Sequence, residues 1–234
     1  MADAPLSIVL IPGLGADAGV YRFQREALGS RVVVPDWIEP RWPRESLESY
    51  AKRFARVIEA MPNVTRPYYI GGNSFGGMIA GEICELPWTH PAGLLLIGSC
   101  THRSQVRYLF RIGEMVVRFT PRGLIKGWMN KLVPDVFGWL EGCDPHEARV
   151  MHEVTFRTDV RLLKWGGHAI RSWRSLAASR VPIFQAHGER DFVIPMRRQD
   201  LVPGRDLIVP GGRHLIHLTH APEVNAWLER VTRA

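Results

Sequence analysis

Short apolar, β-branched runs alternate along the chain with amphipathic segments. Six runs predict buried strands: Leu6–Ile11, Arg31–Trp37, Tyr68–Gly71, Ala92–Gly98, Val181–Ala186 and Asp206–Val209. Apolar residues at helical spacing predict helices over Ala18–Leu28, Leu47–Met61, Met78–Leu86 and Val224–Val231. Strands that alternate with helices require crossover connections. We therefore predict an α/β fold with a mostly parallel sheet of about six strands, covered on both faces.

Residues 101–180 interrupt this alternation, because their pattern is helical throughout. Glycine and proline break it at Gly113, Pro121, Pro134, Gly138 and Pro145. The segment also carries large aromatic residues, namely Trp128, Phe137, Trp139, Trp165 and Trp173. Such an apolar segment must pack onto something, and we expect it over one edge of the sheet. The predicted organisation is a core of residues 1–100 and 181–234 with a helical insertion at 101–180.

The charge of the chain is confined to this insertion. The 234 residues include 30 Lys and Arg against 23 Asp and Glu, a formal net charge of +7. Residues 101–180 hold 14 basic and 7 acidic residues, a net charge of +7. The remainder holds 16 of each and therefore has no net charge. The basic residues follow no recognised nucleic-acid-binding motif, and we expect no nucleic-acid partner.

The cysteines and the apolar runs bear on the compartment. Cys84, Cys100 and Cys143 form neither a disulfide framework nor a paired zinc signature, which suits a reducing compartment. No apolar run reaches the roughly 18 residues of a membrane span, and the N-terminus lacks the basic region of a signal peptide. We expect a cytoplasmic protein with no transmembrane segment.

The segment Gly72-Asn73-Ser74-Phe75-Gly76 matches the pattern G-x-S-x-G. It lies directly after a predicted strand and before a predicted helix, which is the context that a serine nucleophile needs. A sharp strand-to-helix turn exposes the serine hydroxyl, and the helix N-terminus favours negative charge there. The alternative is a tight turn with an incidental serine, which the strand–turn–helix context disfavours.

A serine nucleophile needs a base that an acid orients, and in this architecture the acid and then the histidine follow the serine. Asp191 lies just beyond the fifth predicted strand and is the predicted acid, with Glu189 as a less favoured competitor. His214 lies on a glycine-flanked loop beyond the sixth strand and is the predicted base. His217 and His220 could join it in a metal cluster, but no carboxylate completes a zinc site, so we expect no metal.

Acyl transfer places negative charge on the carbonyl oxygen of the substrate, and we expect two backbone N–H groups to stabilise this oxyanion. One belongs to Phe75, the residue after the nucleophile. The other is assigned to Leu14, in the loop after the first strand. A phosphate-binding turn is the alternative for that loop, but it lacks the G-x-G-x-x-G and G-x-x-x-x-G-K-[ST] patterns, and we expect no cofactor.

Four segments resemble the α/β-hydrolase family, of the compact, lid-bearing esterase and carboxylesterase type. They are PGLGAD (12–17), GGNSFGGM (71–78), HGERDFVIP (187–195) and GGRHLIH (211–217). The resemblance implies Ser74, Asp191 and His214 as the triad, Leu14 and Phe75 as oxyanion donors, and residues 101–180 as a helical lid. Two features depart from the family: Pro12-Gly13 replaces the common His-Gly, and the usual first two strands are missing.

The predicted function is a serine hydrolase that cleaves small carboxylic esters or thioesters through an acyl-enzyme. Haloalkane dehalogenases and epoxide hydrolases are similar to this family but use aspartate as the nucleophile. A serine at that position therefore argues against those two activities. It does not separate an esterase from a thioesterase, a C–C bond hydrolase or a cofactor-free haloperoxidase. The alternative is a non-catalytic relative that binds a ligand or a partner; the substrate-binding residues are not identifiable from the sequence.

The insertion also offers one basic flank. An apolar stripe in its first predicted helix comprises Val106, Leu109, Phe110, Val116 and Val117, and four arginines flank it: Arg103, Arg107, Arg111 and Arg118. We interpret this flank as a solvated surface. The alternative is a site for an anionic partner: a phosphate-bearing acyl carrier, a carboxylated ester or an anionic membrane surface.

Overall fold

A single six-stranded sheet organises the protein. The computed structural model describes residues 6–108, 117, 119–156, 159–176 and 179–233. The strand order is β2-β1-β3-β4-β5-β6, and all neighbouring pairs are parallel, as predicted. The strands are β1 (Ile8–Ile11), β2 (Val32–Val33), β3 (Tyr68–Asn73), β4 (Pro91–Ile97), β5 (Ile183–Gly188) and β6 (Leu207–Val209).

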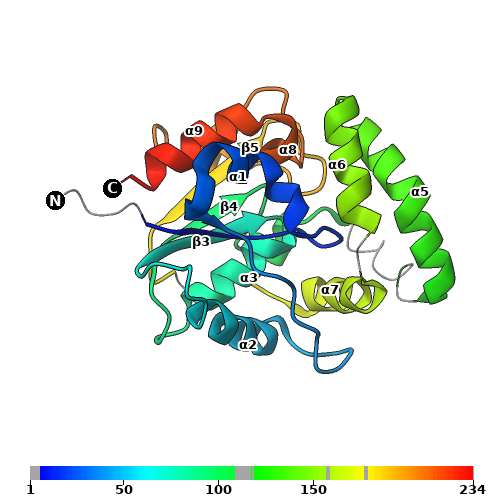
Figure 1. Ribbon diagram of the computed structural model, residues 1–234, viewed down its shortest axis with the longest axis horizontal. Coiled ribbons are helices and arrows are strands. Elements are labelled where there is room, and N and C mark those ends of the chain that lie inside the picture. The colour runs from blue at the N-terminus through cyan, green and yellow to red at the C-terminus, as the bar shows by residue number, and fades with distance from the viewer. Residues whose placement is uncertain (1–5, 109–116, 118, 157–158, 177–178, 234) are drawn as a thin grey trace.

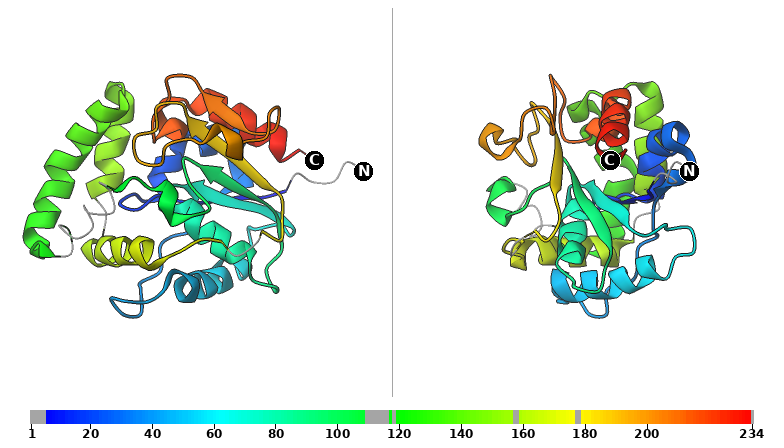
Figure 2. Two further views of the ribbon diagram at one scale, coloured as in Figure 1. Left: turned by 180° about the vertical axis from the view of Figure 1, so that it is seen from behind. Right: turned by 90° about the vertical axis from the view of Figure 1, so that its left-hand side faces the viewer.

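Helices cover both faces of this sheet. The helices of the described residues are α1 (Arg22–Leu28), α2 (Leu47–Glu59), α3 (Phe75–Cys84), α5 (Arg122–Glu141), α6 (Pro145–Phe156), α7 (Val160–Ser172), α8 (Ile216–Thr219) and α9 (Ala221–Val231). Short 3-10 turns lie at Ala18–Tyr21, Gly29–Arg31, Arg103–Gln105 and Arg198–Asp200. Helices α1, α8 and α9 lie on one face and α2 and α3 on the other, while α5 and α6 stand beyond the end of the sheet opposite the chain termini (Figures 1 and 2).

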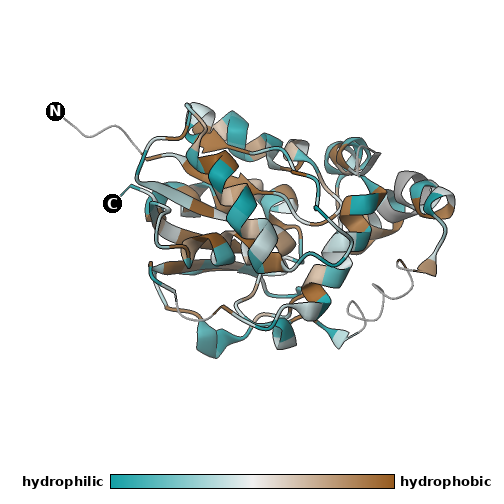
Figure 3. Cartoon of the chain, turned by 90° about the horizontal axis from the view of Figure 1, so that it is seen from below, coloured by the Kyte–Doolittle hydropathy of each residue, from teal (hydrophilic) through white to brown (hydrophobic). Residues whose placement is uncertain are grey.

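The core follows from the two-residue period of the strands. All four residues of β1 are fully buried. Ile8 and Leu10 pack with the α9 side, whereas Val9 and Ile11 pack with α2 and α3. A strand buried on both faces reads as a continuous apolar run, which is why this strand shows no alternation in sequence. Hydrophobic and hydrophilic residues alternate along the helices that surround the sheet, as expected for helices with one face on a core (Figure 3).

The second strand is shorter than predicted. It comprises only Val32–Val33, whereas the apolar run extends from Arg31 to Trp37. It is an edge strand of the sheet, and Pro35 has no N–H with which to extend the ladder. Beyond it the chain leaves the sheet, and the Trp37 indole donates a hydrogen bond to the Ala16 carbonyl at 2.8 Å.

The described residues between β4 and β5 include the helices α5, α6 and α7, and the two ends of this segment meet. An antiparallel bridge joins His102 to Ser175. The Arg103 N–H donates to the Arg174 carbonyl at 2.9 Å, and the Leu176 N–H donates to the Thr101 carbonyl at 3.0 Å. The helices α5, α6 and α7 therefore leave and rejoin the core at one place.

Helix α7 anchors this segment to the core. The buried indole of Trp165 donates to the Glu45 carbonyl at 2.9 Å, and that of Trp173 donates to the Glu82 carboxylate at 2.6 Å. These two aromatics pack onto the core, as expected for the insertion.

Helix α5 differs from the expectation. Trp128 is 45% exposed and Trp139 79% exposed, because α5 packs mainly against α6 with one face only. Pro134 and Gly138 lie inside α5 and do not end it, so the breaks predicted there are wrong. Among the described residues, no helix combines the length and apolar character that a membrane crossing needs.

The predicted basic flank is only partly covered by the structure. Arg103 donates to the Arg171 carbonyl, and Arg107 is exposed. Val106 is buried. Most other members of the predicted helix lie outside the described residues, namely Leu109, Phe110, Arg111, Val116 and Arg118. Val117 is described, but both of its neighbours are not.

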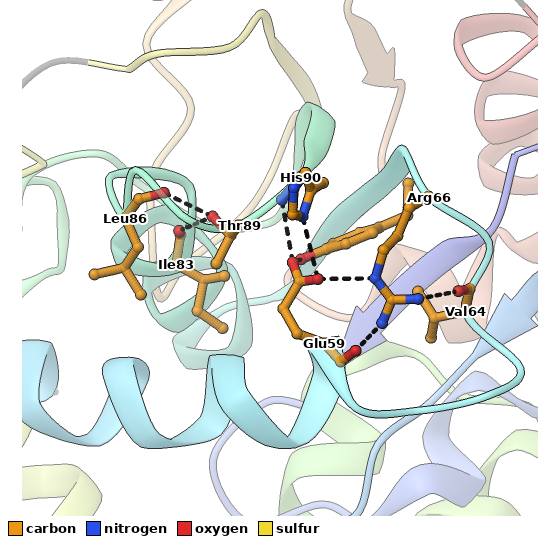
Figure 4. Close-up of polar contacts among 8 residues, drawn as sticks. Glu59, Val64, Arg66, Ile83, Leu86, Thr89 and His90 are labelled. Carbon is orange, nitrogen blue, oxygen red and sulfur yellow. Dashed lines mark hydrogen bonds and ion pairs between the residues drawn. The ribbon is translucent and has the colours of Figure 1, made fainter.

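A charged cluster closes the loop between α2 and β3 (Figure 4). Glu59, the last residue of α2, accepts hydrogen bonds from the Tyr68 hydroxyl at 2.7 Å and from the Arg66 Nε at 2.9 Å. Its Oε1 also accepts the His90 N–H at 3.1 Å. Although burial by itself raises the pKa of the Glu59 carboxyl, these donors outweigh it and hold that pKa below its ordinary value. The cluster joins the end of α2 to the starts of β3 and β4.

Candidate active site

The turn between β3 and α3 holds Ser74 in a strained conformation. Ser74 has φ 52° and ψ −118°, a region that costs a residue with a side chain about 1–3 kcal/mol. Two contacts support the turn: the Ser74 N–H donates to the Ile97 carbonyl at 3.1 Å, and the Ser99 hydroxyl donates to the Ser74 carbonyl at 2.6 Å. The surrounding strands therefore stabilise a backbone that directs Ser74 away from the sheet.

The two glycines of the motif are required by close backbone contacts. A Cβ on Gly72 would lie 2.1 Å from the Ile11 carbonyl oxygen. A Cβ on Gly76 would lie 2.0 Å from the same oxygen and 2.5 Å from the Pro12 carbonyl oxygen. Helix α3 can therefore approach the end of β1 only with glycine at these positions, which brings the first loop beside Ser74.

The structure brings together the predicted acid and base. His214 Nδ1 lies 2.9 Å from Asp191 Oδ2, and both side chains are buried. The other oxygen, Asp191 Oδ1, accepts the N–H groups of Val193 and Ile194, each at 2.8 Å. Because a carboxylate can only accept, Nδ1 carries the proton of a neutral imidazole and Nε2 remains free to take another.

The surroundings of His214 favour its protonated form. Burial by itself lowers the pKa of the imidazole, but the charge and hydrogen bond of Asp191 and the charge of Glu141 outweigh it. The pKa of His214 is therefore raised above its ordinary value. An imidazole in this setting is a stronger base than a free histidine.

Glu189, the competing acid, lies elsewhere. It is exposed and forms an ion pair with Arg198 at 3.1 Å. Its other oxygen accepts the Gly211 N–H at 3.3 Å. Its position is that of a surface turn residue, whereas Asp191 is buried against the imidazole.

The other two histidines of the C-terminal segment do not gather around His214 as metal ligands. His217 is fully buried and packs against the Tyr21 ring, with 5.1 Å between the centroids. Burial lowers the pKa of His217 to about 3, so its ring is neutral. His220 Nδ1 lies 2.9 Å from the Thr219 hydroxyl. In the described part of the chain, no three potential ligands among His, Cys, Asp and Glu are grouped to hold a metal ion.

Asn73 is a site residue that the sequence reasoning missed. Its side-chain N–H₂ donates to the carbonyls of Ile97 and His214, each at 3.2 Å. Its backbone N–H donates to the Tyr21 hydroxyl at 2.6 Å, and that hydroxyl donates to the Ile11 carbonyl at 3.1 Å. Its position inside the G-x-S-x-G pattern is the only sequence signal, since these partners are far away in the chain.

One cavity of about 270 Å³ contains both Ser74 and His214. Its lining comes from the first loop, the serine turn, the inserted helices and the histidine loop. Most of the lining is apolar, and it comprises Gly13, Leu14, Gly15, Ala16, Val20, Asn73, Ser74, Phe137, Met151, Val154, Thr155, Leu163, Val193, His214 and Leu215. Two larger hollows of about 490 and 720 Å³ contain neither Ser74 nor His214, so their size does not make them the candidate site.

Of the two predicted oxyanion donors, Leu14 lines this cavity, and Phe75 directly follows Ser74, which also lines it. Phe75 is the first residue of α3, so its N–H has no acceptor within the helix. Leu14 lines the cavity in a turn closed by the Ala16 N–H and the Gly13 carbonyl at 3.2 Å. The Leu14 side chain packs on Gly166 of α7, where a Cβ would lie 2.4 Å from Leu14 Cδ1. The inserted helices therefore help to position the first loop.

Comparisons with known proteins agree with the fold described above. The alpha/beta hydrolase family matches residues 8–227. No curated protein matches the chain significantly in sequence. A malate-bound thermophilic esterase from Thermogutta terrifontis superposes with a TM-score of 0.73 at 17% identity, covering 97% of this chain and 90% of that one.

Two further solved structures are similar in fold. An enol-lactonase from Burkholderia xenovorans has a TM-score of 0.74 and 15% identity, with 97% of this chain and 91% of that chain covered. A hydrolase from Pseudomonas aeruginosa has a TM-score of 0.73 and 16% identity, with coverage of 100% and 92%. Since the family match spans nearly the whole chain, this protein belongs to the alpha/beta hydrolase family.

Proposed function

We propose that this protein is a serine hydrolase that cleaves small carboxylic esters or thioesters through an acyl-enzyme. The observation that carries the proposal is the 2.9 Å contact between His214 Nδ1 and Asp191 Oδ2 beside a cavity that also contains Ser74. The esterase and the enol-lactonase of similar fold support hydrolysis of a carboxylic ester bond.

Ser74, His214 and Asp191 divide the chemistry. His214 Nε2 takes the proton of the Ser74 hydroxyl while the serine oxygen bonds to the substrate carbonyl carbon. Asp191 keeps the imidazole oriented and stabilises the imidazolium. The same proton then passes to the leaving alcohol or thiol, and the acyl group stays on Ser74. Water, deprotonated by His214, releases the acid and restores the serine.

The N–H groups of Leu14 and Phe75 are the proposed donors to the oxyanion. Each such donor typically lowers the barrier by about 3–4 kcal/mol. Leu14 suits this role because it lines the cavity, and Phe75 because it directly follows Ser74 and begins α3.

The cavity supports a small, uncharged acyl group. Its volume is about 270 Å³, and neither Lys nor Arg is among the described residues that line it. We propose that α5, α6 and α7 act as a lid over the acyl group, because the cavity-lining residues Phe137, Met151 and Leu163 come from these helices.

The three cysteines are free, which fits the proposed cytoplasmic location.

A fluorophosphonate probe tests the nucleophile. The wild-type protein and the Ser30→Ala variant, which removes an exposed serine, are expected to be labelled, and Ser74→Ala is not. Equal labelling of wild type and Ser74→Ala would overturn the proposal. Absence of labelling in the wild type would favour the non-catalytic alternative. A series of nitrophenyl esters of increasing chain length, tested beside acyl thioesters, then identifies the acyl group and the leaving group.

A further inference from the structure

The C-terminal end of helix α5 binds the loop that carries His214. Glu141, the last residue of α5, is only 4% exposed. Its Oε2 accepts the Leu215 N–H at 2.8 Å, and Leu215 directly follows His214. On the other side of the histidine, the Arg213 guanidinium donates to the Leu140 carbonyl. The residues before and after His214 are thus both bound by the end of one inserted helix.

The second oxygen of Glu141 has no such partner. Glu141 Oε1 is buried and, within the described part of the chain, forms no hydrogen bond. Removing a carboxylate from water without full hydrogen bonding costs free energy, and stability alone would favour an apolar residue at this position. A buried carboxylate with an incomplete set of donors beside a proposed general base is therefore a candidate for a functional role.

Four charged or titratable groups surround this carboxylate. His214 and Arg213 come from the histidine loop, Asp191 from the loop after β5, and Cys143 from the residues just after α5. Burial raises the pKa of the Glu141 carboxyl to about 7, against the lowering effects of His214, the Leu215 N–H and Arg213. The negative charge of Glu141 in turn raises the pKa of His214.

We propose that Glu141 is a positioning residue for His214, which fixes the backbone behind the base and adds a second carboxylate near the imidazolium. The inference rests on the proposed function, because it assumes that His214 is the base. It also links the insertion to the chemistry, since the base is fully supported only while α5 is docked. Asp191 remains the hydrogen-bond partner of the imidazole, and Glu141 exchanges no proton with the substrate.

The Glu141→Gln variant separates charge from shape. Glutamine keeps an oxygen that can accept the Leu215 N–H but removes the negative charge. We expect kcat/KM to fall roughly threefold to thirtyfold with little change in KM. Removing a negative neighbour lowers the pKa of His214, so the acidic limb of the kcat/KM profile should move to lower pH than in the wild type.

The matched control is Glu153→Gln, which neutralises an exposed glutamate on α6. It should keep the wild-type profile. Glu141→Ala, which also removes the acceptor, should lose more kcat than Glu141→Gln; if it fails to fold, Glu141→Gln still decides. A Glu141→Gln profile that superimposes on the wild type overturns the inference. Fluorophosphonate labelling of Ser74 is measured in parallel, because an unlabelled wild type would instead overturn the proposed function.

Discussion

The side-chain amide of Asn73 donates a hydrogen bond to the backbone carbonyl of His214 at 3.2 Å. Asn73 directly precedes Ser74, so one carboxamide joins the turn of the proposed nucleophile to the loop of the proposed base. The same amide also binds the Ile97 carbonyl, at the end of β4. Asn73 thereby holds the turn of Ser74 and the loop of His214 relative to one another.

Asn73→Ala should impair turnover more than binding. The carbonyls of His214 and Ile97 would lose a buried donor, which typically costs about 1–3 kcal/mol of stability, and the histidine loop could shift. A displacement of about 1 Å can lower the rate by about a hundredfold, so we expect a fall in kcat of roughly tenfold to a hundredfold. Steady-state kinetics and thermal unfolding measure both effects.

The control for this variant is Asn63→Ala, at an exposed position after α2. It should change neither kcat nor stability appreciably. A normal kcat in a merely destabilised Asn73→Ala protein would show that the amide is structural only.

Asp191→Asn should remove most of the activity without removing the side chain. An amide in place of the carboxylate can donate to Nδ1 and favour the wrong tautomer of His214. The expected fall in kcat is on the order of a thousandfold or more. Glu189→Gln, in the exposed ion pair with Arg198, is the comparison and should retain activity. Comparable losses in the two variants would contradict the assignment of Asp191 as the acid.

The pH dependence of kcat/KM follows from the raised pKa of His214. A general base acts in its neutral form, so activity rises as pH increases through that pKa. The acidic limb of the wild-type profile should therefore lie above the ordinary histidine pKa of about 6.5. In Asp191→Asn the residual activity should show a limb at lower pH, because the charge that raises the pKa is gone. An unshifted limb would mean that another group controls it.

Gly76→Ala should prevent stable folding. The added Cβ would lie 2.0 Å from the Ile11 carbonyl oxygen, and backbone atoms there cannot move aside cheaply. We expect a loss of about 3 kcal/mol or more. The comparison is Gly127→Ala in α5, where a Cβ meets no atom within 4 Å. There alanine should raise the free energy of unfolding, by at most about 1 kcal/mol. Chemical denaturation of both variants tests the contrast, and a stable Gly76→Ala protein would contradict it.

Glu59→Gln should destabilise the fold in a pH-dependent way. The pKa of Glu59 is lowered in the folded protein, so its contribution is present above the ordinary glutamate pKa and is lost as pH falls through the folded value. At neutral pH we expect a loss of about 1–2 kcal/mol, since hydrogen bonds to a charged group are weakened. The difference from wild type should shrink toward acidic pH. Denaturant unfolding at a series of pH values measures it, and a constant difference would argue against the charge.

The sequence by itself determined the elements and the nucleophile turn, because both depend on local patterns. Buried runs such as Ile8–Ile11 identify strands, and the glycines on either side of Ser74 mark the turn in the sequence. The carboxyl ends of parallel strands share one edge of the sheet, so residues that follow β5 and β6 are expected on the same side. Asp191 and His214 could therefore be placed near each other from sequence alone.

Only the tertiary structure decided what supports these residues. Glu141 and Leu215 are separated by 74 positions, and Asn73 and His214 by 141, so no local pattern relates either pair. Likewise, apolar character did not decide burial in the insertion, where Trp165 is buried and Trp139 is 79% exposed. Local composition fixes which segments form helices, whereas the packing of α5, α6 and α7 on the core decides which of their side chains reach the site.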